Sequence, residues 1–241
     1  MREIFIGTAG WSIPTAHAPK FSSAGSHLER YARIFHCAEI NTTFYRPHRP
    51  ATWARWAEST PPDFRFSVKL PRAITHDSSL VCEREHLLPF FDQIRTLGQR
   101  LGPLLIQLPP SQSFDPLRAP AFLETIRTEY PDGPIVIEPR HPTWFSSEAE
   151  QLLCHLRIAR VIVDPPICPA SLTPGGDPSL VYIRLHGSPR MYYSSYDDAF
   201  LDGIASLISK HSSATAWCIF DNTAHGHATA NALQLLQKIP G

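Results

Sequence analysis

Short apolar runs bounded by turn residues alternate along this chain with stretches whose apolar positions recur at helical spacing. The runs predict eight strands, at Ile4 to Thr8, Ala38 to Tyr45, Phe64 to Leu70, Leu104 to Leu108, Ile135 to Arg140, Arg160 to Asp164, Val181 to His186 and Ala216 to Asn222. The helical spacing predicts helices at Ser26 to Phe35, Ala51 to Ala57, Glu85 to Leu101, Ala119 to Tyr130, Glu148 to Leu156, Ala199 to Lys210 and Ala228 to Gln237. Residues 165–178 contain too much proline and glycine for a full helix.

This alternation predicts an α/β fold, a single (β/α)8 TIM-type barrel with a closed parallel sheet. No linker or internal break divides the 241 residues, so we expect one domain over residues 1–241. A doubly wound open sheet is the alternative. It is disfavoured because no glycine-rich dinucleotide-binding loop follows the first strand.

The charge balance changes what partners are expected. The chain has 22 basic and 22 acidic residues, so no overall field attracts nucleic acid, which stays a less favoured partner. No apolar run approaches the roughly 18 residues of a membrane span, and the amino terminus enters a strand without a signal-peptide stretch. We therefore expect a cytoplasmic protein with reduced cysteines and no membrane partner, and the pattern predicts no particular oligomeric state.

The seventh predicted strand carries Tyr182, Arg184 and His186 on one face and apolar residues on the other, before a turn at Gly187. In a barrel such a polar face points inward, and the carboxyl ends of the strands line the site. The two-residue period, applied to every strand, predicts an inward polar set: Glu39, Asn41, Lys69, Gln107, Glu138, Arg140, Asp164, Arg184, His186 and Asn222.

The simplest role for this set is a balanced salt-bridge network that closes the barrel. However, a barrel centre filled only for stability would use layers of branched aliphatic residues. Buried charges are also costly unless they pair with one another or meet a polar ligand. The set as a whole therefore indicates a site.

One chemistry that the set suggests is metal binding. Glu39, Glu138, Asp164 and His186 together would supply hard oxygen ligands and one imidazole, a combination that suits magnesium, manganese or zinc. The neighbouring cations disfavour this interpretation, because they would already neutralise the carboxylates. We assign no metal ligands and expect no cofactor, while a divalent metal stays an alternative.

Two metal-free chemistries also fit. Lys69 would act as a base or a Schiff-base nucleophile if burial lowers its pKa, with Glu138 or Asp164 carrying protons. Alternatively, Arg140 and Arg184, together with His186, would hold an anionic substrate while a carboxylate does acid or base work. The anion-binding interpretation uses most of the residues and leaves the fewest charges unexplained.

The loops after the seventh and eighth strands extend this interpretation. Gly187 and Ser188 form one turn, and Thr223 to His227 lead into a helix, whose amino terminus offers backbone amides to a phosphate. Tyr45, after the second strand, places an aromatic face where a base or sugar ring would lie. The predicted mouth thus suits a phosphorylated ligand.

Several segments of this sequence resemble the YecE-like family, domain of unknown function 72. The resemblance rests on Gly7 to Ser12, Glu39 to Tyr45, Phe66 to Lys69 with Thr75 to Asp77, Leu101 to Pro110, Glu138 to Trp144, Tyr182 to Gly187 and Asn222 to Ala228. It covers nearly the whole chain in order, except that Thr15 to Phe21 departs from the Trp, Gly and Phe-Tyr-Pro pattern of the family. The resemblance implies a TIM-type barrel and no established reaction.

We therefore expect an enzyme that acts by general acid/base chemistry on a small anionic or phosphorylated, sugar-like or nucleotide-like molecule. The expected catalytic residues are Glu39, Lys69, Glu138, Asp164 and His186, and the expected substrate-binding residues are Asn41, Tyr45, Gln107, Arg140, Arg184, Gly187, Asn222 and Thr223. One alternative is a non-catalytic protein that binds a nucleotide, a nucleic-acid end or a metabolite. A second alternative is a divalent-metal-dependent hydrolase or isomerase.

Overall fold

The computed structural model describes residues 3–239 and shows a mixed α/β fold. Its strands are β1 (Ile4–Ala9), β2 (Cys37–Ile40), β3 (Arg65–Lys69), β4 (Leu101–Gln107), β5 (Ile135–Glu138), β6 (Ile158–Arg160), β7 (Ile162–Asp164), β8 (Gly175–Gly176), β9 (Leu180–Leu185) and β10 (Thr215–Phe220). Its α-helices are α1 (His27–Ala32), α2 (Pro50–Glu58), α3 (Arg72–Thr75), α4 (Arg84–Ile94), α5 (Arg118–Glu129), α6 (Ser147–His155), α7 (Asp198–Lys210) and α8 (His227–Lys238). No helix within residues 3–239 is both long and apolar enough to cross a bilayer.

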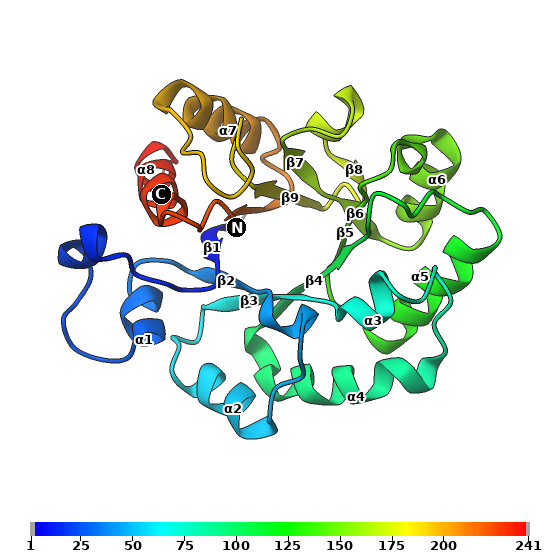
Figure 1. The fold of residues 1–241 in the computed structure, drawn as a ribbon, viewed down its shortest axis with the longest axis horizontal. Helices are drawn as coiled ribbons and strands as arrows, with labels where there is room; N and C mark the ends of the chain where they lie inside the picture. The colour runs from blue at the N-terminus through cyan, green and yellow to red at the C-terminus, as the bar shows by residue number, and fades with distance from the viewer. Residues whose placement is uncertain (1–2, 240–241) are drawn as a thin grey trace.

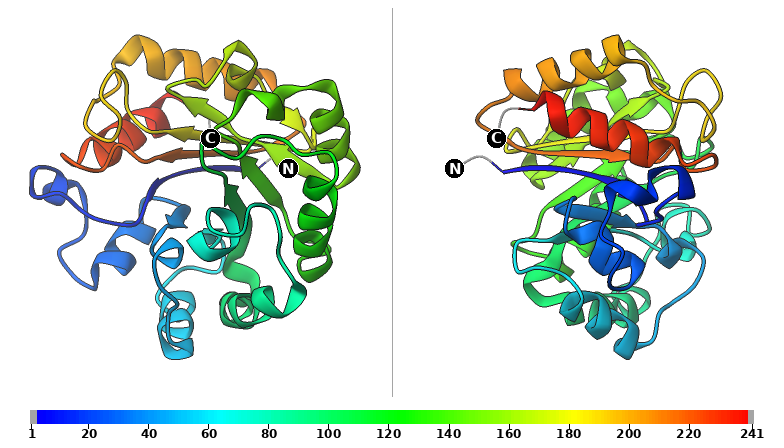
Figure 2. Two further views of the ribbon diagram at one scale, coloured as in Figure 1. Left: turned by 45° about the vertical axis from the view of Figure 1, so that its right-hand side comes forward. Right: turned by 90° about the vertical axis from the view of Figure 1, so that its left-hand side faces the viewer.

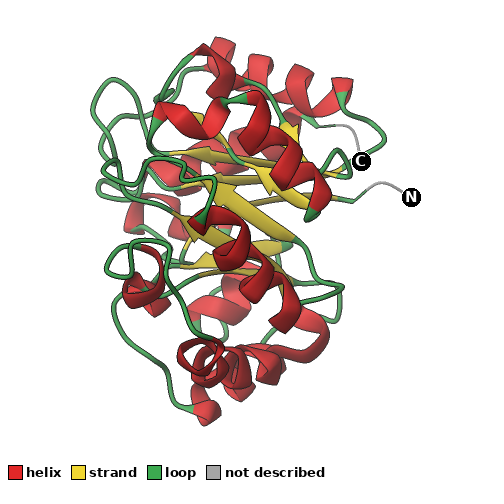
Figure 3. Ribbon diagram, turned by 90° about the vertical axis from the view of Figure 1, so that its right-hand side faces the viewer, coloured by secondary structure: helices red, strands yellow, loops and turns green. Residues whose placement is uncertain are grey.

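The strands form one curled sheet in the order β7-β9-β10-β1-β2-β3-β4-β5-β6-β8, and the helices lie outside it (Figures 1, 2 and 3). All neighbouring strands pair in parallel except β8, which pairs antiparallel with β6. Only Val161 separates β6, which pairs with β5, from β7, which pairs with β9. The sheet is therefore mixed, and its ladder is interrupted at Val161. The prediction of a closed, all-parallel barrel was wrong in these two respects.

Two predicted elements, the second strand and the helix from Glu85, end five or more residues earlier in the structure. The second strand stops at Ile40, and Thr42–Phe44 forms a short 3-10 turn that carries the chain over the end of the sheet. Helix α4 ends at Ile94 because the following turns break at Gly98, where φ is +53°. The first break brings loop residues to the carboxyl-terminal end of the sheet near Phe44, whereas the second lies just before β4, at the opposite end of the sheet.

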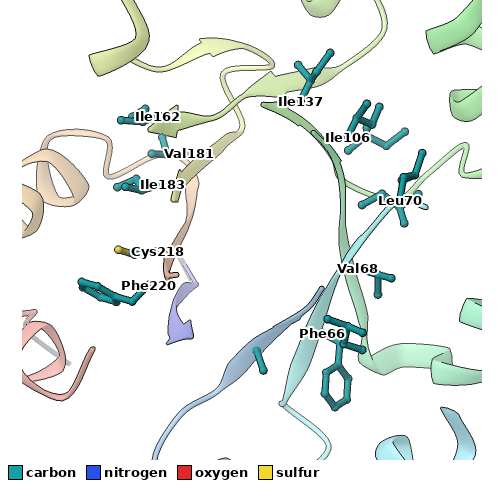
Figure 4. Packing of buried hydrophobic residues seen from close by; sticks show 14 of the residues in the cluster. Phe66, Val68, Leu70, Ile106, Ile137, Ile162, Val181, Ile183, Cys218 and Phe220 are labelled. Atoms are coloured by element: carbon teal, nitrogen blue, oxygen red, sulfur yellow. The ribbon is translucent and has the colours of Figure 1, made fainter. Parts of the chain in front are cut away.

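The core has two layers that follow the two faces of the strands. The larger layer packs the outward faces against the helices, and Figure 4 shows Phe66, Ile106, Ile137, Ile162 and Phe220 pointing away from the centre of the curled sheet. The smaller layer fills the inside of the sheet with Phe5, Cys37, Leu105, Val136, Ala159, Val161, Leu180, Tyr182, Trp217 and Ile219. Residues that follow the inner layer by two positions therefore enter the carboxyl-terminal mouth.

Gly7 lies where β1 and β2 approach closely, opposite Cys37. A Cβ atom at Gly7 would lie 2.2 Å from the Cys37 carbonyl oxygen, a backbone atom that cannot move aside. We expect Gly7→Ala to lower the free energy of unfolding by about 1–3 kcal/mol, because overpacking shifts the strands apart. The measurement is urea denaturation. Gly203→Ala on α7 is the control, since a Cβ there meets nothing within 4 Å, and it should leave stability equal or raised. Equal effects of the two changes would contradict this packing argument.

Candidate active site

A fully buried arginine on β9 organises the centre of the mouth. Arg184 donates from Nε to Glu39 Oε2 at 3.0 Å and from Nη2 to Glu39 Oε1 at 2.6 Å, so the contact is bidentate. It also donates from Nη1 to Glu138 Oε2 at 2.6 Å and from Nη2 to Asp221 Oδ2 at 3.1 Å. One guanidinium thus pairs with three carboxylates, from β2, β5 and the end of β10.

Below Arg184 the inner layer fixes the orientation of Glu39. The hydroxyl of Tyr182 donates to Glu39 Oε2 at 2.8 Å, and Ser67 Oγ lies 2.8 Å from the same hydroxyl. Trp217 stacks on the Tyr182 ring with a centroid separation of 6.0 Å. Glu39 therefore has donors on both oxygens, all of them from β9.

His186 lies beside Arg184 and is also fully buried. Its Nδ1 lies 3.0 Å from Asp221 Oδ2, and its Nε2 lies 3.2 Å from Glu138 Oε1 and 2.8 Å from Arg140 Nη2. Arg140 in turn forms an ion pair with Glu138. The Nε2 atom thus has a partner in both protonation states: it donates to Glu138 when protonated and accepts from Arg140 when neutral.

The charged neighbours in this network raise the pKa of His186 and lower the pKa values of Glu138 and Asp221. Burial alone would lower the pKa of His186, but the Glu138 carboxylate and the hydrogen bond to Asp221 outweigh it, so the pKa lies above its usual value. Burial alone would raise the pKa of Glu138, yet Arg184 and Arg140 hold it well below its usual range. Arg184 and His186 likewise lower the pKa of Asp221 against the effect of burial. Both carboxyls are therefore ionised at neutral pH.

Lys69, at the end of β3, sits on the open side of this network. Its Nζ donates to Gln107 Oε1 at 2.8 Å and lies 4.0 Å from the centroid of the Phe44 ring. Burial and the nearby Arg184 lower the pKa of Lys69 to about 8, despite the opposing effect of the surrounding carboxylates. A substantial fraction of this amine is therefore uncharged in mildly alkaline solution.

Two cavities open above the network and share Asn41, Asp221 and Thr223. The first, which we call the mouth cavity, has a volume of about 420 Å³, and the residues around it are Asn41, Phe44, Tyr45, Lys69, Arg72, His76, Gln107, Tyr192, Asp221 and Thr223. The second, the tryptophan cavity, has a volume of about 520 Å³ and extends past Trp11 and Trp56. Asn41 Oδ1 is buried and has no hydrogen-bond partner among the described residues, so it can accept from a ligand.

The structure places most of the predicted residues at this end of the sheet. Those in or beside the network are Glu39, Asn41, Lys69, Gln107, Glu138, Arg140, Arg184 and His186. Tyr45 and Thr223 lie on the cavity walls. Asp221 was missed. It follows Trp217 and Ile219 on the inward face of β10, and its side chain is 13% exposed at the cavity floor. Counting the period from Trp217 would have found it.

Asp164 and Asn222 were assigned to the wrong face. They share a face with Ile162 and Phe220, which point outward into the helix-covered layer (Figure 4). Asp164 accepts from the Tyr196 hydroxyl at 2.8 Å, and Asn222 donates to Ser194 and Asn231. Both residues therefore anchor the loop after β9 instead of entering the mouth.

Three backbone amides of the predicted phosphate-binding loops, residues 187–188 and 223–227, already have partners within the protein. The Gly187 amide donates to the Tyr196 hydroxyl at 2.7 Å, and the Ala224 amide donates to the Tyr192 carbonyl at 3.1 Å. The Gly226 amide donates to the Thr223 carbonyl at 3.0 Å. These amides already have partners, so Gly187 shapes the turn rather than presenting its amide to an anion.

The residues proposed as metal ligands do not fit a metal. Asp164 lies on the opposite face of the sheet from Glu39, Glu138 and His186, and the two glutamates accept from Arg184. No group of three or more His, Cys, Asp or Glu side chains within residues 3–239 is arranged to hold a metal ion. Arg184 occupies the place between the carboxylates that a cation would take.

The fold and sequence were compared with known proteins. The structure of a DUF72 family protein from Thermotoga maritima MSB8 matches with a TM-score of 0.80 and 26% identity, covering 98% of each chain. A D-psicose 3-epimerase from Clostridium cellulolyticum H10, crystallised with D-tagatose, matches with a TM-score of 0.55 and 8% identity, covering 98% of this chain and 97% of the epimerase. The second likeness shows a TIM-barrel-like fold alone.

The sequence matches are more specific. UPF0759 protein YecE of Escherichia coli K12 is 38% identical over 170 residues, which cover 67% of this chain and 59% of YecE. The match thus spans less than two thirds of that relative. The family model described as protein of unknown function DUF72 matches residues 5–240. The resemblance seen in the sequence is confirmed, and the chain belongs to the DUF72 family.

Proposed function

We propose that this protein is an enzyme that moves protons on a small anionic, sugar-like molecule bound in the mouth cavity. The observation that carries the proposal is the shared position of Lys69 and Asp221, whose pKa values are displaced, on the wall of one cavity. Titratable groups with displaced pKa values in a cleft are characteristic of acid/base catalysis. A pure structural network has no need to present a partly neutral amine to an open cavity.

In this proposal each group has a separate role. The neutral amine of Lys69 removes a proton from a carbon next to a carbonyl, and Gln107 holds the amine in place. Asp221 orients a hydroxyl group of the substrate, while His186 behind it holds a proton. Arg184 and Glu138 are positioning residues, because they touch Asp221 and His186 rather than the mouth cavity.

The cavity wall supports an anionic ligand with hydroxyl groups. Lys69, Arg72 and His76 lie on the wall of the mouth cavity, where Asp221 is the single acidic residue among the described ones. The unpartnered Oδ1 of Asn41 suits a hydroxyl donor. The likeness to a D-psicose 3-epimerase, although it shows the fold alone, makes ketoses and their phosphates the first substrates to examine.

The test is hydrogen exchange in D₂O. Ketoses, aldose phosphates and sugar acids are incubated with the protein at pH 8, and ¹H NMR follows the loss of each C–H signal as deuterium enters. We expect exchange at the carbon next to a carbonyl for one class of anionic sugar. Lys69→Met should slow it at least about 100-fold, because general base catalysis contributes that much.

Lys210→Met is the matched control, because Lys210 is exposed on α7. It should leave the exchange rate unchanged. Exchange that persists in both Lys69→Met and Asp221→Asn would show that these residues are not catalytic. Ligands that raise the melting temperature without any exchange would favour the non-catalytic binding alternative.

A further inference from the structure

A third cavity adjoins the mouth cavity on the side of α3 and α4. We call it the side groove; its volume is about 440 Å³, and its walls come from residues 43–47, from Pro71 to Ile74 with Asp77, and from one face of α4 between His86 and Gln93. The aromatic and proline side chains among its lining residues are Phe44, Tyr45, Phe90, Pro47, Pro71 and Pro89, and charged or polar side chains on the same walls are Arg46, Arg72, Asp77, His86 and Gln93. A volume of this size suits a small ligand, and the three prolines limit the movement of its walls.

The side groove and the mouth cavity share Phe44, Tyr45 and Arg72. Phe44 separates them: the Lys69 ammonium lies 4.0 Å from the centroid of its ring, and the same side chain also lines the groove. A ligand whose anionic end meets Lys69 would therefore reach the groove by passing Phe44. Arg72 would lie beside the link between the two ends of such a ligand.

The groove is suited to a flat ring. The Tyr45 ring is 80% exposed and meets the Phe44 ring edge to face, with a centroid separation of 5.0 Å. Phe90, on α4, also lines the groove, so a ring entering it would meet aromatic side chains from two separate segments of the chain. A ring-bearing ligand would cover both the exposed Tyr45 ring and the Phe44 and Phe90 side chains that line the groove.

We propose that the ligand of this site carries an aromatic ring as well as its anionic group, and that the ring binds in the side groove. This inference rests on the proposed function for the placement of the anionic end near Lys69. It adds a substrate class, namely sugar-like anions joined to an aryl or heteroaryl group. The ring is recognised by the walls of the groove, and the reacting group is recognised by the mouth cavity.

Isothermal titration calorimetry with two probes tests the inference in the full-length protein. Phenyl phosphate carries a ring and an anion, and inorganic phosphate carries the anion alone. We expect phenyl phosphate to bind at least about tenfold more tightly. Ala73→Phe places a ring in the groove from an exposed position on α3, so it should remove this advantage and leave phosphate binding unchanged.

Ala199→Phe, at an exposed position on α7, is the matched control and should preserve the tenfold ratio. Lys69→Met should weaken both probes and keep their ratio. Equal affinities of the two probes, including no measurable binding of either, would overturn the inference, and so would a ratio that survives Ala73→Phe. The proposed function is tested separately by the deuterium-exchange experiment, and an absence of exchange would contradict that function without bearing on the ratio of the two affinities.

Discussion

Replacing Arg184 by methionine should lower the free energy of unfolding by about 3–5 kcal/mol, because it leaves buried carboxylates without their partner. Glu39 and Glu138 are fully buried, and each accepts a hydrogen bond of 2.6 Å from the Arg184 guanidinium. Methionine fills a similar volume, so the loss reports the uncompensated charges and not a cavity. The measurement is equilibrium denaturation in urea at pH 7.

The pH dependence gives this experiment a second readout. Arg184 holds the pKa of Glu138 well below its ordinary value of 4.5, so the ionised carboxylate stabilises the fold above pH 4.5. That contribution is lost as the pH falls through the lowered pKa of the folded state. The difference between the wild-type protein and Arg184→Met should therefore be largest at neutral pH and smaller in acid.

Two further variants separate charge from packing. Arg118→Met removes an arginine that is 57% exposed and 3.6 Å from Asp115, so it should cost less than about 1 kcal/mol. Adding Glu39→Gln and Glu138→Gln to Arg184→Met should restore part of the lost stability, because the amides need no counter-charge. A loss for Arg184→Met as small as that for Arg118→Met would refute the account of a buried charge network.

A second large effect is expected from Lys69 at alkaline pH. Its pKa is about 8 in the folded protein and has an ordinary value of 10.5, so between these values the unfolded chain binds more protons than the folded one. Stability then rises with pH across this window, and the penalty for burying the charge is fully present below pH 8. A lowering of this size corresponds to about 3 kcal/mol.

The measurement compares unfolding free energies of the wild-type protein and Lys69→Met from pH 7 to 10.5. We expect the wild-type protein to gain stability relative to Lys69→Met across this window, and Lys210→Met to track the wild type. Reductive ¹³C-methylation followed by NMR titration should give a lysine resonance with a pKa of about 8 that is absent from Lys69→Met. Parallel stability curves for the wild-type protein and Lys69→Met would rule out a buried charge at this position.

The two-residue period of the strands accounts for most of what could be predicted. Glu39, Glu138 and Arg184 follow inward residues of the inner layer by two positions, so their convergence at one end of the sheet could be predicted from spacing alone. The two-residue period assigns residues to the wrong face of the sheet where the first inward residue of a strand is uncertain. On β7 and β10 the adjacent residue was chosen, which exchanged Asp221 for Asn222 and turned Asp164 inward.

The sequence by itself determined the alternation of strands and helices, the family, and the presence of charged residues at the carboxyl ends of the strands. The elements and the charged strand ends depend on local periodicity, and the family depends on short motifs, so both are visible within short segments of the sequence. Only the tertiary structure decided that Arg184 pairs with Glu39, 145 residues away, that Asp221 faces the cavity, and that the amides of Gly187, Ala224 and Gly226 already have partners. Such pairings depend on how the sheet curls and where its ladder breaks at Val161, and no local pattern encodes the distances that result.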